Sequence, residues 1–456
     1  MNRKYQPVIG LEIHVELKTK SKMFCQCKAD YFNEKPNSNT CPVCLGLPGA
    51  LPVPNKKAID WTILIGKALN CTINNQSKFD RKHYFYPDLP KGYQISQYDE
   101  PIASKGKFRV QNLEFRITRV HLEEDTAKLI HAGNDTLVNF NRSGVPLVEI
   151  VTEPDFDNSD DVKKFLEELQ VIIRYLGVSD ADMERGTMRL EPNISVKLKV
   201  KNEKLRVDDL PKYKVEVKNI NSFRFVKQAI DYEIIRQIEL LEKGETPKQE
   251  TRGFDEKKVI TYSQRSKEEA HDYRYFPEPD IPPMTFDGQY LDKIFRQIPE
   301  LPQAKIQRYV KDFKIKEQDA FIITRIPTLA VFFESVIPNL KSQTCLPARQ
   351  VSKLNLKIQN YEQNLANIII NKKISTNLSP SEFTQKVLSL SKPKKTNLKL
   401  LDTLINRLIE VNQKTVEDYK KGKQNALMFL VGQVMKEMKG KADAKIVIER
   451  LRIKLH

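Results

Sequence analysis

The sequence lacks the short motifs that mark the common nucleotide-binding and hydrolytic sites. It contains no GxxxxGK[ST] loop, no GxGxxG after a predicted strand, no GxSxG and no HExxH. Each of these patterns places glycines, a nucleophile or metal ligands at a spacing that its chemistry requires. A Walker-type phosphate loop, a dinucleotide-binding fold, a serine-hydrolase elbow and a helix-borne zinc-protease site are therefore excluded.

Long apolar segments are also missing. No run of 18 apolar residues occurs, so no transmembrane helix and no membrane partner are predicted. The first ten residues, MNRKYQPVIG, contain no apolar signal-peptide core. We therefore expect a cytoplasmic protein, or one of an organelle matrix if the chain is a processed form.

The charge is strongly and unevenly positive. The 456 residues carry a formal net charge of +17, and residues 391–456 hold 16 Lys and Arg against 7 Asp and Glu. Such an excess favours a polyanionic partner, either nucleic acid or an anionic surface. The alternative is that the positive charge has no binding role and reflects only a composition that is rich in Lys and Asn.

The pattern of apolar and polar residues along the chain predicts an α+β fold in three parts. Residues 1–293 alternate apolar and polar residues between turn signals, as strands do, and helical periodicity interrupts them at 159–177 and 222–244. Residues 294–390 are helical in pattern. A Lys-rich connector follows at 389–397, and the segment from Leu398 to His456 is predicted to form two or three short basic helices.

Three predicted strands carry acids. In GLEIHVEL, Glu12, His14 and Glu16 face one way and the apolar residues the other. In RVHLEEDTAK, three successive acids follow His121, a set that suits a hard cation such as Mg²⁺. Solvated faces or charged turns would explain these two strands as well. The third is NRSGVPLVEIVTEPD, where Glu149 lies inside an apolar run and needs a metal or an ion pair.

Two further segments bear on binding. Residues 79–99 interleave basic and aromatic side chains, which suits phosphate and base contact or, equally, packing on a core. Four of the six cysteines lie within 20 residues. Cys25 and Cys27 precede the turn CPVCLGLPG, which contains Cys41 and Cys44. Four thiolates at this spacing predict a structural Zn²⁺ site without an open coordination position, and unliganded thiols are the alternative.

Taken together, these segments resemble one family. The chain is similar to the GatB/GatE family, the B subunits of tRNA-dependent amidotransferases, over nearly all of residues 8–283. The resemblance is carried by VIGLEIHVEL, CPVCLGLPGALPVPN, FDRKHYFYPDLPKGYQISQ, HLEEDTAK, NRSGVPLVEIVTEPD, YLGVSDADMERGTMR, VEVKNINSF and DYRYFPEPDIPP. A second block, NALMFLVGQVMKEMKGKADAKIV at 425–447, is similar to the family's tail.

The resemblance implies a fold. It predicts a β-rich antiparallel cradle with helices at 1–293, which holds ATP, Mg²⁺, the aminoacyl-tRNA 3′ end and the zinc knuckle at 25–44. An all-α domain at 294–390 follows. A YqeY-like helical tail at 391–456, shorter than is typical of the family, would bind tRNA.

The resemblance also implies an activity. The enzyme would be a glutamine-hydrolysing aminoacyl-tRNA amidotransferase, an ATP-dependent carbon–nitrogen ligase that works as a heterotrimer. The present chain would phosphorylate the side-chain carboxylate of Glu-tRNA(Gln), Asp-tRNA(Asn) or both. Ammonia released by the amidase, which is the A subunit of the complex, would then give the amide. A small C subunit would stabilise the complex.

Site residues follow from matching family motifs. The resemblance assigns Mg²⁺ and catalysis to Glu12, His14, Glu124 and Glu149, with Glu123 and Asp125 beside them. It assigns ATP binding to Arg81, Lys82, Asn141 and Arg142, and the tRNA 3′ end to Lys91, Tyr93 and Gln94.

Two other functions are open at this point. One is a non-catalytic tRNA-binding subunit of the same complex, although such a subunit would not need the acid and histidine set. The other is a stand-alone ligase. The chain has no Ser-Ser-Lys amidase signature, so an amidase partner is predicted instead.

Overall fold

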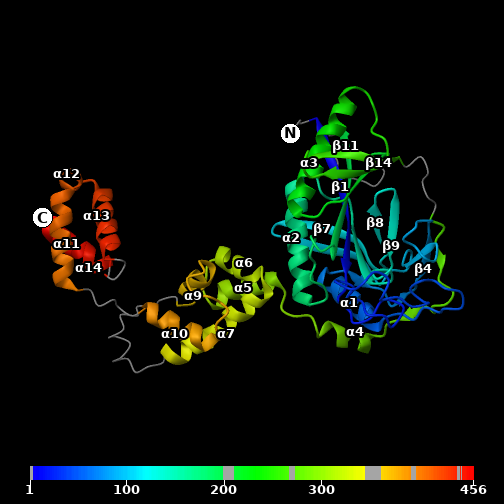
Figure 1. The fold of residues 1–456 in the computed structure, drawn as a ribbon, viewed down its shortest axis with the longest axis horizontal. Helices are drawn as coiled ribbons and strands as arrows, with labels where there is room; N and C mark the ends of the chain where they lie inside the picture. The colour runs from blue at the N-terminus through cyan, green and yellow to red at the C-terminus, as the bar shows by residue number, and fades with distance from the viewer. Residues whose placement is uncertain are drawn as a thin grey trace. The chain divides into compact units, whose positions relative to one another are not determined.

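The computed structural model describes residues 4–198, 210–266, 273–344, 361–391, 397–438, 442 and 444–455. The chain divides into two compact units, Met1–Ala304 and Lys305–His456. The first is sheet-rich and the second is helical, so the predicted α+β class is confirmed (Figure 1).

A nine-stranded sheet forms the centre of the first unit. In order across the sheet, its strands are β14 (Ile260–Ser266), β13 (Glu250–Asp255), β12 (Val215–Lys218), β11 (Met188–Leu198), β1 (Tyr5–Glu16), β10 (Pro146–Thr152), β7 (Leu113–Glu124), β6 (Ala103–Val110) and β2 (Thr72–Ile73). Neighbours are antiparallel except β12 and β13, which are parallel. A helix connects these two strands, as a parallel pair requires.

Three helices pack on the apolar face of this sheet. They are α1 (Lys56–Ala68), α2 (Ser159–Leu176) and α3 (Phe223–Glu242), and in Figure 1 α2 and α3 lie along one side of the sheet. The last two match the helices predicted at 159–177 and 222–244. The side chains of Asn158 and Ser222 accept hydrogen bonds at the two N-termini, and Gly177 ends α2 with φ +68°.

The central strand β1 has the two faces that its alternation predicts. Leu11, Ile13 and Val15 are at most 1% exposed and pack into the main core. Glu12 and His14 point to the other face, which the helices leave free.

Short elements complete the first unit. They form the sheet β15 (Phe276–Pro277), β4 (Asp80–His83) and β5 (Tyr93–Ser96), the pair β16 (Met284–Thr285) and β3 (Gln76–Ser77), the hairpin β8 (Lys128–Ala132) and β9 (Asp135–Asn139), and the helix α4 (Gly288–Phe295). Residues of β5 donate hydrogen bonds to carboxylates of β7, so the β4–β5 sheet lies over the polar face of the large sheet.

Two separate hydrophobic cores stabilise the helical unit. The first core lies among the helices α5 (Pro302–Asp312), α6 (Glu317–Thr324), α7 (Pro327–Thr344), α9 (Tyr361–Ile370) and α10 (Pro380–Ser391). The second lies among α11 (Leu398–Val411), α12 (Gln413–Lys420), α13 (Gln424–Glu437) and α14 (Ala444–Leu455).

The described part of the tail therefore has four helices, not the two or three predicted. Helix α12 has a weak apolar pattern, because it contains no fully buried residue and only Val416 and Tyr419 pack, partly buried, against the core. In the described ranges no single helix is long and apolar enough to cross a membrane. Helices α6 and α7 meet that test only as a pair, bent by 119°.

Candidate functional site

Acidic side chains form a row across five neighbouring strands on the polar face of the large sheet. The row runs through Glu123 of β7, Glu149 of β10, Glu12 and His14 of β1, Glu191 of β11 and Glu216 of β12. His14 lies directly opposite Glu149, and Glu12 lies directly opposite Glu191. Directly paired residues have Cβ atoms about 4.5–5.5 Å apart, so the register alone gathers these charges.

The first group within the row is the histidine triad, His14, Glu123 and Glu149. Nε2 of His14 lies 3.5 Å from Oε1 of Glu123 and 3.7 Å from Oε2 of Glu149. On the far side of Glu149, Nε2 of His121 lies 3.1 Å from the same Oε2. Burial alone would raise the pKa of Glu149, but His121, His14 and Lys82 hold it well below its usual value.

The second group is the glutamate triad, Glu12, Glu191 and Glu216. Burial, followed by the charges of Glu149 and Glu191, raises the pKa of Glu12. Nζ of Lys218 lies 2.9 Å from Glu191 and 3.7 Å from Glu216. In each triad the candidate ligand atoms lie within 4.8 Å of one another. Oxygen-rich clusters of this kind suit hard divalent cations.

Glu124 lies outside both triads. Its Oε1 is 2.6 Å from Nζ of Lys91 and accepts a hydrogen bond of 2.9 Å from the backbone N–H of Ile95. The Gln94 side chain donates to the Glu124 carbonyl at 2.7 Å. Of the predicted Mg²⁺ set, the structure thus brings His14 and Glu149 together, places Glu12 in the neighbouring triad and pairs Glu124 with Lys91.

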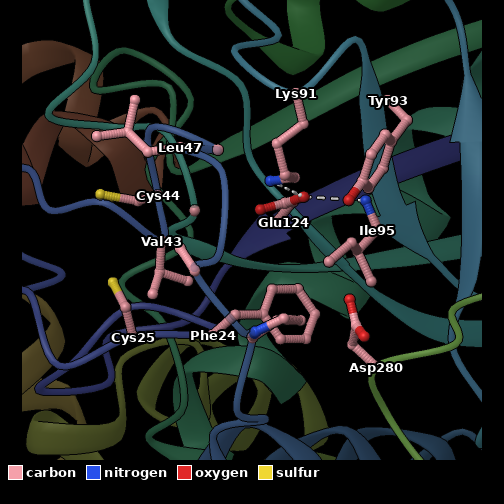
Figure 2. A pocket seen from close by; sticks show the side chains of 14 residues that line it. Phe24, Cys25, Val43, Cys44, Leu47, Lys91, Tyr93, Ile95, Glu124 and Asp280 are labelled. Carbon is pink, nitrogen blue, oxygen red and sulfur yellow. Dashed lines mark hydrogen bonds and ion pairs between the residues drawn. The ribbon is translucent and has the colours of Figure 1, made fainter.

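A cavity of about 130 Å³ separates this ion pair from the cysteines. Figure 2 shows Lys91 and Glu124 on one side of it and Cys25 and Cys44 on the other. Tyr93 and Asp280 also line the cavity. Two of the three residues predicted for the tRNA 3′ end, Lys91 and Tyr93, therefore line the same cavity as Cys25 and Cys44.

Lys82 of β4 acts electrostatically on two carboxylates of the histidine triad, Glu123 and Glu149. Burial opposes its charge, but Glu123 and Glu149 hold the pKa of Lys82 well above its ordinary value. Its Nζ also lies 5.2 Å from the ring centre of Tyr273. An ammonium between two carboxylates and an aromatic ring is suitably placed to meet a phosphate beside a bound cation.

The side chains of the other predicted ATP-binding residues form hydrogen bonds to other groups of the protein. Arg81 forms two hydrogen bonds of 2.7 Å to the carboxylate of Glu278. Arg142 donates to the carbonyls of Thr126 and Ala127, each at 2.9 Å, and Asn141 is buried with its amide on the Lys35 carbonyl at 2.7 Å. These contacts order the loops around the site, and a nucleotide role for the three residues stays a prediction.

The four clustered cysteines meet in space. The Sγ atoms of Cys25, Cys27, Cys41 and Cys44 all lie within 4.8 Å of one another. A hydrogen bond from Cys25 is the main cause that lowers the pKa of Cys44 to about 5, and the Cys41 N–H and the charge of Lys22 add to it. Four converging sulfurs, one already favouring the thiolate, fit the tetrahedral ligand set of Zn²⁺.

Sequence reasoning missed Glu191, Glu216 and the lysine that pairs with them. The signal was present, since RLEPNISV and VEVK alternate in the same way as β1. These acids were overlooked because only the pairing of β1 with β11, and of β11 with β12, brings them beside Glu12.

Two family models match this chain. A family model described as the GatB/GatE catalytic domain matches residues 7–292, and one described as a GatB domain matches residues 346–455. The chain belongs to the GatB/GatE family. The resemblance read from the sequence, including its YqeY-type helical tail, is confirmed.

Relatives align with this GatB/GatE chain almost end to end. Proteins of Thermotoga maritima and Carboxydothermus hydrogenoformans, each named as the B subunit of aspartyl/glutamyl-tRNA(Asn/Gln) amidotransferase, are 44% and 43% identical to it. Their alignments cover 98% and 99% of this chain, respectively, and 99% of each relative. The catalytic-domain match includes both triads, Lys82 and the cysteine cluster.

Proposed function

We propose that this chain is the B subunit of a tRNA-dependent amidotransferase and that the carboxylate row is its ATP-dependent activation site. The substrates would be Glu-tRNA(Gln), Asp-tRNA(Asn) or both, because the relatives' names cover both. The observation that carries the proposal is the juxtaposition of the histidine triad with Lys82 inside the family's catalytic domain.

The reaction needs charge neutralisation and alignment more than covalent help from the protein. An oxygen of the substrate carboxylate attacks the γ-phosphorus of ATP, and ADP leaves. Ammonia then attacks the carbonyl carbon of the acyl phosphate, loses a proton and expels phosphate. Lys82 would hold the phosphate charge, and Tyr84 and Tyr273 around Lys82 would limit the access of water.

The cation ligands can be assigned within this scheme. His14, Glu123 and Glu149, with Glu12 in the adjoining triad, would hold Mg²⁺, which neutralises phosphate charge when bound. Asp125 ends the same acid run and is engaged by Arg189 at 2.5 Å, so its role would be to order the strand end. The predicted role of Glu124 requires that its oxygen leave Lys91.

The cysteine cluster would bind a structural zinc ion. Four sulfurs leave no coordination position for substrate, so the ion would hold the 25–44 segment against the cavity of Figure 2. That segment would form one wall of the site for the tRNA 3′ end. Lys91 and Tyr93 also line this cavity, and Gln94 follows Tyr93 in β5.

The partners are a misacylated tRNA, the amidase (the A subunit) and the small C subunit. A non-catalytic tRNA-binding subunit is the alternative. The carboxylate row argues against it, because carboxylates repel the phosphates that a pure RNA-binding surface must attract.

The test combines the chain with its co-expressed partner subunits, γ-labelled ATP, Mg²⁺, glutamine and misacylated tRNA. We expect amide product and labelled phosphate only when all are present. Offering Glu-tRNA(Gln) and Asp-tRNA(Asn) separately assigns the specificity. Tight tRNA binding without ATP-dependent product would support the non-catalytic role. Glutamine-dependent product from the chain alone would refute the amidase partner.

A further inference from the structure

One lysine side chain lies inside the molecule beside the cysteine cluster. Lys22 is 1% exposed and is among the largest fully buried side chains. Its Nζ donates to the carbonyl oxygen of Asn39 at 2.9 Å and to that of Phe140 at 3.4 Å, and it lies 3.7 Å from Sγ of Cys44. An ammonium has three N–H donors and no acceptor, so these three contacts account for all of them. Lys22 has no part in the proposed reaction.

The surroundings of Lys22 leave its charge without a carboxylate. The described residues offer its ammonium two neutral carbonyls and one sulfur. Lysine is almost never fully buried unless it is paired, because an uncompensated charge inside a protein is strongly unfavourable. Among these three contact atoms, only Sγ of Cys44 can carry a negative charge, which it does as a metal-bound thiolate.

A zinc ion on the cysteine cluster would complete this pairing. Four thiolates around one Zn²⁺ leave two excess negative charges on the centre. Groups that donate hydrogen bonds to metal ligands orient those ligands and raise the affinity for the ion. A buried ammonium against one sulfur would neutralise half of the excess charge. The anionic centre and the buried lysine therefore compensate each other, since each is unfavourable to bury alone.

We propose that Lys22 is the positioning residue of the cysteine-bound metal centre. It holds the Cys44 thiolate through its charge and a hydrogen bond, and it connects the centre to the loop at 140–145. This role rests on the zinc site of the proposed function and goes beyond it, because it names the residue that balances the charge of the centre and the segment that responds to the metal.

The backbone places Lys22 between the two halves of the cluster. Residues 20–29 fold back on themselves, and the N–H of Lys22 donates to the carbonyl of Cys27 at 2.9 Å. The side chain of Lys22 then reaches Cys44 in the second half of the cluster. Lys28, on the same folded segment, is 56% exposed instead. One lysine of this segment is thus buried against a sulfur and the other is at the surface.

The loop that Lys22 contacts leads to the histidine triad. Residues 140–145 directly precede β10, the strand that carries Glu149. Oγ of Ser143 donates to the carbonyl of Cys44 at 3.2 Å. Gly144 has φ +82°, and a Cβ at this position would lie 3.5 Å from Cβ of Cys44. Because the metal-binding segment and this loop are in direct contact, loss of the metal should loosen the loop.

Zinc affinity of the full chain tests the charge of Lys22. In competition with a chelator, we expect Lys22→Met to bind zinc about 10–100-fold more weakly, as loss of an outer-shell partner typically does. Lys28→Met is the matched control, because it removes the same charge from the same segment but from an ammonium that pairs with Glu34 at the surface. Its zinc affinity should equal that of the wild type. Lys22→Gln retains donors for the two carbonyls, and we expect the same loss from it if Lys22→Met does not fold.

Cobalt in place of zinc gives a readout that a merely structural lysine would not change. We expect the thiolate-to-cobalt charge-transfer band to move to lower energy in Lys22→Met, because the sulfur loses a donor and a nearby positive charge. The band of Lys28→Met should stay in place. With both proteins saturated with zinc, hydrogen exchange at 140–145 should be faster in Lys22→Met than in the wild type.

Several results would overturn the role of Lys22. They are unchanged zinc affinity in both Lys22 variants, an equal band shift in Lys28→Met, unchanged exchange at 140–145, and a wild-type cluster that binds neither zinc nor cobalt. Amide formation is measured separately on the complete complex. A zinc-loaded complex that makes no amide would refute the proposed function and leave the role of Lys22 standing.

Discussion

Removing the Lys91 ammonium should destabilise the sheet-rich unit by about 3 kcal/mol. Its Nζ lies 2.6 Å from Glu124 Oε1, and the two side chains are only 11% and 5% exposed. Breaking a buried pair by removing one partner typically costs about 3–5 kcal/mol. The low end applies because Glu124 keeps the Ile95 N–H and because the pair borders a cavity.

Two nearly isosteric variants and their double mutant measure the pair. Lys91→Met keeps the apolar stem, and Glu124→Gln keeps the shape of the carboxylate. The double mutant should be more stable than the sum of the single losses predicts, by about 1–3 kcal/mol. Trp61 is the chain's single tryptophan and packs against the core of this unit, so its fluorescence in urea follows this unit specifically.

A surface pair provides the control. Lys28 and Glu34 are 2.9 Å apart but 56% and 40% exposed, so Lys28→Met should destabilise the unit far less than Lys91→Met. If Lys91→Met proved no more destabilising than Lys28→Met, or if the Lys91 and Glu124 effects were additive, the reasoning about buried charge at this cavity would be refuted.

Three further predictions address the site and the helical unit. Wild-type protein should contain one zinc per chain, and Cys44→Ser but not Cys71→Ser should lose it; absence of stoichiometric zinc with four freely titratable cluster thiols would contradict this. Glu149→Gln should lower the rate of ATP-dependent amidation at least about 100-fold and leave the affinity for tRNA unchanged. The control Glu114→Gln, which changes an exposed glutamate, should leave the rate unchanged. Equal rates for the two variants would remove Glu149 from the site. Burial would raise the pKa of Glu334, but hydrogen bonds from Lys305, Tyr309 and Arg308 outweigh it and lower that pKa. The ionised Glu334 therefore stabilises the fold above its unfolded pKa of about 4.3, and this stabilisation is lost as the pH falls. Hydrogen exchange in 302–312 and 327–344, corrected for intrinsic rates, should therefore rise more steeply below pH 5 in the wild type than in Glu334→Gln, and parallel pH profiles would contradict this.

Local patterns predicted the parts of the fold that depend on local physics. The period of two in β1 and the caps of α2 and α3 are readable from neighbouring residues, so their faces and ends matched the prediction. The cysteine cluster was also predictable, because its two cysteine pairs lie within 20 residues of each other in the sequence.

Features set by distant pairing were not predictable in this way. Nothing near Glu12 in the sequence indicates that Glu191 lies opposite it, because that pairing joins residues 179 positions apart. Glu124 shows another limit. The resemblance grouped it with His14 and Glu149, but it is the last residue of β7, where the chain leaves the sheet, and it points to Lys91 instead. Its role at a cation remains a prediction.

The central place of β1 has a consequence for biosynthesis. This strand leaves the ribosome well before its two neighbours in the sheet, β10 and β11, which end at residues 152 and 198. At about 5–20 residues per second, the wait for both partners is roughly 10–40 s. During that time β1 presents two unpaired edges and the apolar side chains of Leu11, Ile13 and Val15. The carboxylate row therefore assembles late in translation, and a nascent chain that stops before β11 carries an aggregation-prone strand in place of a site.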